Sequence, residues 1–105
     1  QDYAETMKWY RMAADQGQAE AQFNIGVMYA EGRGVKQDYA ELMKWSRMAA
    51  DQGYAAAQHN IGWMYDNGQG VRQDKKAAKE WFGKACDNGY QSGCDVYRKL
   101  NESGY

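Results

Sequence analysis

A repeat with a fixed period of 36 residues is the feature that most constrains the fold of this chain. Residues 2–37 and 38–73 are identical at 26 of 36 positions, and a looser third copy covers residues 74–105. A period of this length is typical of solenoids, in which each unit packs only against its neighbours. We therefore expect one domain over residues 1–105, made of these three copies, with the last acting as a C-terminal cap.

Each copy is predicted to form two α-helices separated by glycine-containing turns. Asp2 and Asp38 occupy N-cap positions with a glutamate three residues later, which is a capping-box pattern. Three glycines follow the last turn of a first helix, where a left-handed residue closes a helix: Gly17, Gly53 and Gly89. The predicted helices include 2–15, 38–51, 19–30, 55–66 and 91–102. The fold class is therefore all-α, with antiparallel helix pairs forming about three hairpins.

Charge and hydropathy exclude several classes of function. The 13 basic and 14 acidic residues give a net charge of −1, so we expect no nucleic-acid partner. No apolar run approaches the roughly 18 residues of a membrane span. No secretory leader is visible, but the chain starts at Gln1 without a methionine, so we expect it to be a piece of a longer protein.

Two residue types recur at a fixed phase and indicate helix packing. One tryptophan recurs at the same position of every copy, and we interpret these rings as packing anchors: Trp9, Trp45 and Trp81. Gly26 and Gly62 fall inside predicted helices, where glycine costs about 1 kcal/mol relative to alanine. Their recurrence predicts the close approach of a neighbouring helix at both positions.

The strings AEAQFNIGVMYAEGRGVKQDYAELMKWSRMAADQG and AAAQHNIGWMYDNGQGVRQ resemble the Sel-like repeat, a relative of the tetratricopeptide repeat. The resemblance covers nearly the whole chain, and includes the AxAQxNxG start, the MY pair, the GxGV loop and the DYAxxMKW helix. It implies a right-handed α-solenoid that serves as a scaffold or adaptor for a protein or peptide partner, without enzymatic activity. It also implies that the chain starts on the second helix of a family repeat.

The differences between the first two copies identify a candidate binding face. Five of the ten differences fall on the second helix, at positions 20, 23, 27, 30 and 31 of the first copy, which share one helical face. The opposite face is unchanged, so we predict that the variable face is free of packing. The resemblance implies that this face lines a concave groove that binds ligands.

The predicted partner-binding residues combine an aromatic centre with charges at one end. They are Phe23, Val27, His59, Trp63, Asp66, Asp95 and Lys99. This set suits a peptide or loop anchored by an apolar side chain, and Trp63 is the principal candidate. Alternatively, Phe23 and Trp63 pack on each other or beneath an upstream repeat. Asn24 and Asn60 flank this face, and we interpret them as structural amides rather than a carboxylate clamp, which would need paired cations.

Cys86 and Cys94 are the two cysteines, at the end of one predicted helix and the start of the next. A helical hairpin brings such positions close enough for a disulfide, although two reduced, buried thiols in a cytosolic protein are the alternative. The spacing resembles that of secreted bacterial cysteine-rich Sel-like repeat proteins, which implies the bridge. With the bridge, we expect a periplasmic or secreted bacterial protein.

No pattern for catalysis or metal binding is present. Nucleophile-elbow, P-loop, dinucleotide-binding and HExxH motifs are all missing, and His59 alone cannot complete a metal site. We therefore expect no enzyme, no metal and no cofactor, but a monomeric interaction module. The runner-up is a cytosolic regulatory adaptor with free thiols. The resemblance also implies a third alternative, weak β-lactam binding or hydrolysis, although the SxxK signature of the serine enzymes is absent.

Overall fold

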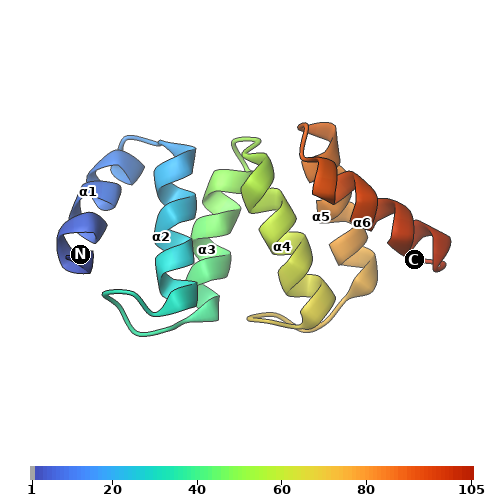
Figure 1. Cartoon of the computed structure of the whole chain (residues 1–105), viewed down its shortest axis with the longest axis horizontal. Helices are drawn as coiled ribbons and strands as arrows, with labels where there is room; N and C mark the ends of the chain where they lie inside the picture. The colour runs from blue at the N-terminus through green and yellow to red at the C-terminus, as the bar shows by residue number, and fades with distance from the viewer. Residues whose placement is uncertain (1) are drawn as a thin grey trace.

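The computed structural model describes residues 2–105, which form six α-helices and no strand. The helices are α1 (Tyr3–Asp15), α2 (Ala19–Glu31), α3 (Tyr39–Ala50), α4 (Ala55–Asn67), α5 (Lys75–Asp87) and α6 (Gln91–Glu102). They follow one another in sequence order along an elongated stack, from α1 at one end to α6 at the other (Figure 1). The stack measures 45 × 24 × 20 Å. The predicted all-α solenoid is confirmed, and each predicted helix agrees with the observed one to within a residue at either end.

Aspartate side chains start the first helix of every copy. Asp38 accepts a hydrogen bond from the backbone N–H of Glu41 at 3.2 Å, and Asp2 and Asp74 cap their helices in the same way. A capping box also needs the glutamate carboxylate to accept a hydrogen bond from the backbone N–H of the N-cap residue. That half of the prediction is wrong, because the Glu41 carboxylate accepts from Trp45 Nε1 at 3.3 Å instead. The indole lies one turn further along the same helical face and competes for the carboxylate.

The two mid-helix glycines bring neighbouring helices together, as predicted. A Cβ on Gly26 would lie 3.3 Å from Cβ of Trp45, which places α3 directly against α2. A Cβ on Gly62 would lie 2.9 Å from the Phe82 ring on α5. The helix-closing glycines also have the predicted left-handed backbone, with positive φ at Gly17, Gly53 and Gly89.

The core is a series of clusters between successive helices. In the first, Met7 of α1, Ile25 and Met28 of α2, and Trp45 of α3 pack together. Further clusters centre on Ile61 of α4 and on Phe82 of α5. Each helix therefore depends on its immediate neighbours for burial, as expected for a solenoid. Among residues 2–105, no helix is long and apolar enough to span a membrane.

A disulfide replaces a repeated hydrogen bond at the turn of the last hairpin. In the second hairpin, Gln58 Nε2 donates to the carbonyl of Ala50 at 3.1 Å and ties α4 to the end of α3. The first hairpin makes the same contact at 3.5 Å. The equivalent positions in the third hairpin are Cys94 and Cys86, which form a disulfide with 4.6 Å between their Cα atoms. The predicted bridge is confirmed, and it joins α5 to α6.

Candidate partner-binding groove

Four of the seven predicted partner-binding residues line one hollow, which we call the central hollow. Phe23 and Val27 contribute from α2, and His59 and Trp63 contribute from α4. The remaining lining residues are Ala30, Glu31, Tyr39, Leu42 and Asn60. The hollow has a volume of about 350 Å³ and lies between α2 and α4, over the first half of α3. The variable faces of two alternate helices therefore meet at one site.

Close helix packing forms the floor of this hollow. The Leu42 side chain on α3 is only 3% exposed, and its Cδ1 would be 3.4 Å from a Cβ on Gly26. The small side chains of Val27 and Ala30 form part of the α2 wall, whereas α4 contributes the large indole of Trp63. The central hollow is thus an apolar depression with an aromatic wall.

Trp63 remains accessible in the folded chain. The residue is 43% exposed, and among residues 2–105 its indole N–H has no hydrogen-bond acceptor. The Phe23 ring packs against Tyr54, with 5.5 Å between ring centroids. The surface therefore offers an indole face and an unpaired donor to a molecule that enters the hollow.

His59 forms an aromatic edge of the hollow. Its ring lies 5.0 Å from the Phe82 ring and 4.8 Å from the Tyr90 ring, measured between centroids. Burial against these rings lowers the pKa of His59 below its ordinary value of 6.5, because the charged form loses hydration. The imidazole is therefore mainly neutral at pH 7, and among residues 2–105 its side chain has no hydrogen-bond partner.

The predicted charged end of the site lies outside the central hollow. Asp66 accepts a hydrogen bond from Lys75 Nζ at 2.7 Å, and this bond raises the pKa of Lys75. Asp95 accepts from the side chain of Gln91 on α6, and Lys99 is exposed on the same helix. Their participation in binding stays a prediction. None of these three side chains contributes to the lining of the central hollow.

The charge that does line the hollow comes from Glu31. This residue belongs to the variable face of α2 but was not among the seven predicted residues. Tyr39 and Leu42 were also missed, because they belong to the first helix of the copy and the prediction relied on second helices alone. The Thr6/Leu42 difference between copies was the available signal for Leu42.

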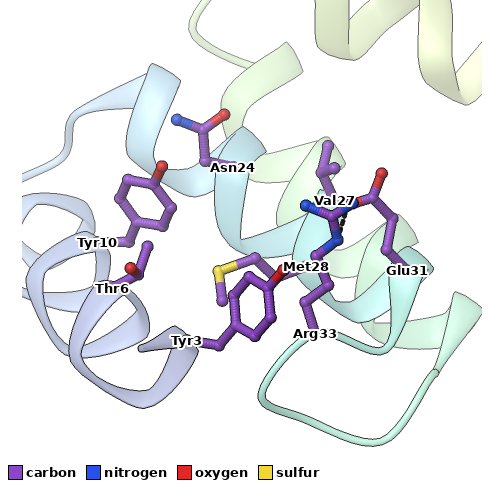
Figure 2. Close-up of a pocket in the computed structure, with 8 residues that line it drawn as sticks. All are labelled: Tyr3, Thr6, Tyr10, Asn24, Val27, Met28, Glu31 and Arg33. Atoms are coloured by element: carbon purple, nitrogen blue, oxygen red, sulfur yellow. Dashed lines mark ion pairs between the residues drawn. The ribbon is translucent and has the colours of Figure 1, made fainter. Parts of the chain in front are cut away.

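A smaller hollow occupies the equivalent position one copy earlier. Figure 2 shows α1 side chains, including Thr6, on one side and α2 side chains, including Asn24, on the other. This hollow has a volume of about 140 Å³. Within residues 2–105, neither Asn24 nor Asn60 makes a side-chain hydrogen bond, so the prediction of structural amides is wrong. The amides border the two hollows, where the spacing between helices leaves them without a protein partner.

The part of the chain that the structure describes holds no group of three or more His, Cys, Asp or Glu side chains arranged to bind a metal ion. The lining of the central hollow likewise combines apolar and aromatic side chains with a single carboxylate and one amide. This composition suits recognition of another molecule by packing and hydrogen bonding.

Comparison with known proteins agrees with the repeat and the fold. The sequence model of the family described as Sel1 repeat matches residues 1–18, 19–54 and 55–90. In this frame repeats start at Ala19 and Ala55, on α2 and α4, so α1 occupies the place of a second helix. The division at 37/38 and 73/74, with a C-terminal cap over 74–105, stays a prediction. A search of curated proteins gives no match.

Three similar solved structures are bacterial repeat proteins. One is c5321, a protective antigen of uropathogenic Escherichia coli with an SLR fold (48% identity, TM-score 0.85, covering 90% of this chain and 20% of that one). Another is a Sel1 repeat protein from Oxalobacter formigenes (39% identity, TM-score 0.84, 88% and 38% covered). Cysteine-rich protein B of Helicobacter pylori shares the fold (22% identity, TM-score 0.85, 89% and 70% covered).

The chain spans only a fifth of the first of these proteins and less than two fifths of the second. The family match nevertheless extends over residues 1–90, and the helical stack superposes on solved repeat proteins over about nine tenths of its length. The resemblance inferred from the sequence is confirmed. This chain belongs to the Sel1 repeat family.

Proposed function

We propose that this chain is a monomeric protein–protein interaction module that binds a peptide or loop of a partner in the central hollow. Sel1 repeats are generally protein-interaction scaffolds, and they are generally not enzymes. The observation that carries the proposal is the 43% exposure of Trp63 beside an apolar hollow of about 350 Å³. Large aromatic residues at the rim of a pocket are typical anchors of binding energy.

Unpaired polar groups support an extended peptide as the occupant. The Asn60 amide and the Trp63 indole N–H border the hollow without protein partners among residues 2–105. An amide supplies both donors and an acceptor, so it can pair with the N–H and C=O groups of a peptide backbone. Apolar walls and backbone hydrogen bonds together would hold a short segment in place.

The binding experiment begins with a displayed random-peptide library selected on the disulfide-bonded protein. Enriched peptides are synthesised and titrated calorimetrically against wild type and Trp63→Ala. We expect the substitution to weaken binding about 30-fold or more, as for an interfacial anchor. Trp9→Ala is the matched control, because Trp9 is 57% exposed but lies outside the central hollow. Equal affinity of wild type and Trp63→Ala would contradict the proposal.

We further propose that the protein works in the bacterial periplasm or outside the cell. The Cys86–Cys94 disulfide supports this location, because such bridges persist in oxidising compartments. The test is mass spectrometry of acid-quenched, alkylated protein from its native host, with and without prior reduction. Alkylation of both cysteines without reductant would support the cytosolic adaptor with free thiols instead.

A further inference from the structure

We propose that the central hollow selects a basic side chain, so that an arginine or lysine of the bound peptide stacks on Trp63 beside Glu31. This inference rests on the proposed function and adds the chemical class of the partner, a basic peptide. Three observations support it: the cations that lie over other tryptophan rings of the molecule, the charge of the helices on the two sides of the hollow, and the shape of the walls.

Cations cover two of the other tryptophan rings, Trp45 and Trp81, whereas within the described part of the chain the exposed Trp9 ring has no cation over it. The Arg11 guanidinium lies 5.6 Å from the centroid of Trp45, and the Arg47 guanidinium lies 5.2 Å from that of Trp81. Lys84 Nζ also approaches Trp81, at 4.2 Å. A cation over an indole face is attracted by the negative potential of the ring. Among residues 2–105, no Lys or Arg approaches the ring of Trp63 in this way, so that face is open to a cation from outside.

The helices on both sides of the hollow carry acidic side chains and no basic ones. Helices α2 and α4 together contain Glu20, Glu31 and Asp66 but neither lysine nor arginine. Asp66 is already paired with Lys75, whereas Glu31 lines the hollow. The neutral state of His59 adds no positive charge that would repel a basic ligand. Helix α3 beneath the hollow carries Lys44 and Arg47, but neither lines it. The charge within the lining therefore favours a cation.

Glu31 is available to a ligand although it has a partner. Its Oε1 lies 3.1 Å from Nε of Arg33, but the two side chains are 47% and 52% exposed. Exposed ion pairs contribute little, because water screens the charges and two long side chains must be held in place. A carboxylate also accepts several hydrogen bonds at once. An incoming guanidinium or ammonium group can therefore share Glu31 with Arg33 or displace Arg33.

The walls of the hollow suit the stem of a long basic side chain. Val27, Ala30 and Leu42 present aliphatic surface between α2 and α4. Lysine and arginine bury their methylene stems against such surface while the charged end remains near polar groups. The hollow thus provides an apolar channel, an indole face and a carboxylate for different parts of one side chain.

The test uses peptides selected on the wild-type protein and titrated at low and high salt. We expect arginine or lysine at one fixed position of the selected peptides. Replacement of that arginine by citrulline, or of that lysine by norleucine, removes the charge and should weaken binding about 3- to 30-fold. Trp63→Leu keeps an apolar side chain but removes the indole and should weaken the charged peptide about 3- to 10-fold more than its neutral analogue.

Glu31→Gln should weaken the charged peptide about threefold at low salt, with a smaller effect at high salt. Glu20→Gln is the control, because Glu20 lies on the same helix but does not line the hollow. Trp63-dependent peptides that bind equally well without their charge would overturn the basic-ligand inference and leave the docking site intact. Both proposals would be overturned if the library yielded no peptides that are enriched on the wild-type protein relative to the Trp63→Ala protein.

Discussion

The first and second copies of the repeat share 26 of 36 residues, yet the same residue has a different environment in each. Trp9 is 57% exposed on α1, whereas the equivalent Trp45 on α3 is 7% exposed. Trp45 packs into the cluster formed with α2, and among the described residues no helix covers the corresponding side of α1. The prediction that all three tryptophans are packing anchors is therefore wrong for Trp9.

The two hollows differ for the same reason. The hollow beside α1 has two helical walls and a volume of about 140 Å³, whereas the central hollow has α2, α3 and α4 around it and measures about 350 Å³. Substitutions between copies then enlarge the apolar surface, with Leu42 replacing Thr6 and Trp63 replacing Val27. The comparison indicates that a large apolar hollow in this scaffold depends on both a neighbouring helix and a few changed side chains.

The largest effect that tests this comparison is the removal of the two equivalent tryptophans. Trp45→Ala should lower the free energy of unfolding by about 3–5 kcal/mol, because it empties a buried site. Trp9→Ala should lower it by less than about 1 kcal/mol, because the side chain is already exposed. Urea unfolding of both variants measures the difference, and equal losses would show that Trp9 is covered in solution.

Removal of the disulfide should have the next largest effect. The double variant Cys86→Ala, Cys94→Ala should lose about 2–3 kcal/mol, since the bridge restricts the unfolded chain. Amide hydrogen exchange should show the loss of protection concentrated in α6, which the bridge joins to α5.

The equivalent hydrogen bond in the second hairpin provides the control. Gln58→Ala removes the side-chain bond to the Ala50 carbonyl and the bond that Gln58 Oε1 accepts from Asn88 Nδ2, and should cost about 1–2 kcal/mol. The assigned role of the bridge would be contradicted if the double cysteine variant were as stable as Gln58→Ala or more stable.

The two glycines at the helix crossings should respond differently to alanine. Gly62→Ala places a Cβ 2.9 Å from the buried Phe82 ring and should be destabilising by about 1–2 kcal/mol. Gly26→Ala meets its nearest neighbour at 3.3 Å, and the gain of about 1 kcal/mol in helix propensity should offset most of the strain. Thermal unfolding of the pair measures the contrast, which would disappear if α5 could shift freely away from α4.

The smallest expected effect is the pH dependence that His59 introduces. Burial lowers the pKa of His59 in the folded state, so the unfolded state binds a proton more readily. The stability contribution is complete above the ordinary pKa of 6.5 and is lost as the pH falls through the lower folded pKa. His59→Phe, which installs the residue of the first copy, should flatten the stability profile between about pH 7 and pH 5. The free energy of unfolding is measured by urea titration at each pH. If it depends on pH equally in wild type and His59→Phe, this assignment is contradicted.

Much of the candidate site could be predicted because the duplicated sequence contains its own comparison. Positions that differ between copies on an otherwise constant helix identified Phe23, Val27, His59 and Trp63, and all four line the central hollow. The charged residues were harder to place. Asp66 is paired with Lys75 at the start of α5, and that contact has no periodic signal in the sequence.

The sequence by itself determined the helices, their caps, their turns and the order in which they stack. Those features depend on local hydrogen bonds, on left-handed glycines and on apolar periodicity, all of which are encoded within a single copy. The tertiary structure alone decided which copy of a tryptophan is buried, whether Asn60 finds a partner, and that Glu31 supplies the charge in the hollow. Burial, pairing and cavity shape depend on which helix lies alongside, so identical residues acquire different roles in neighbouring copies.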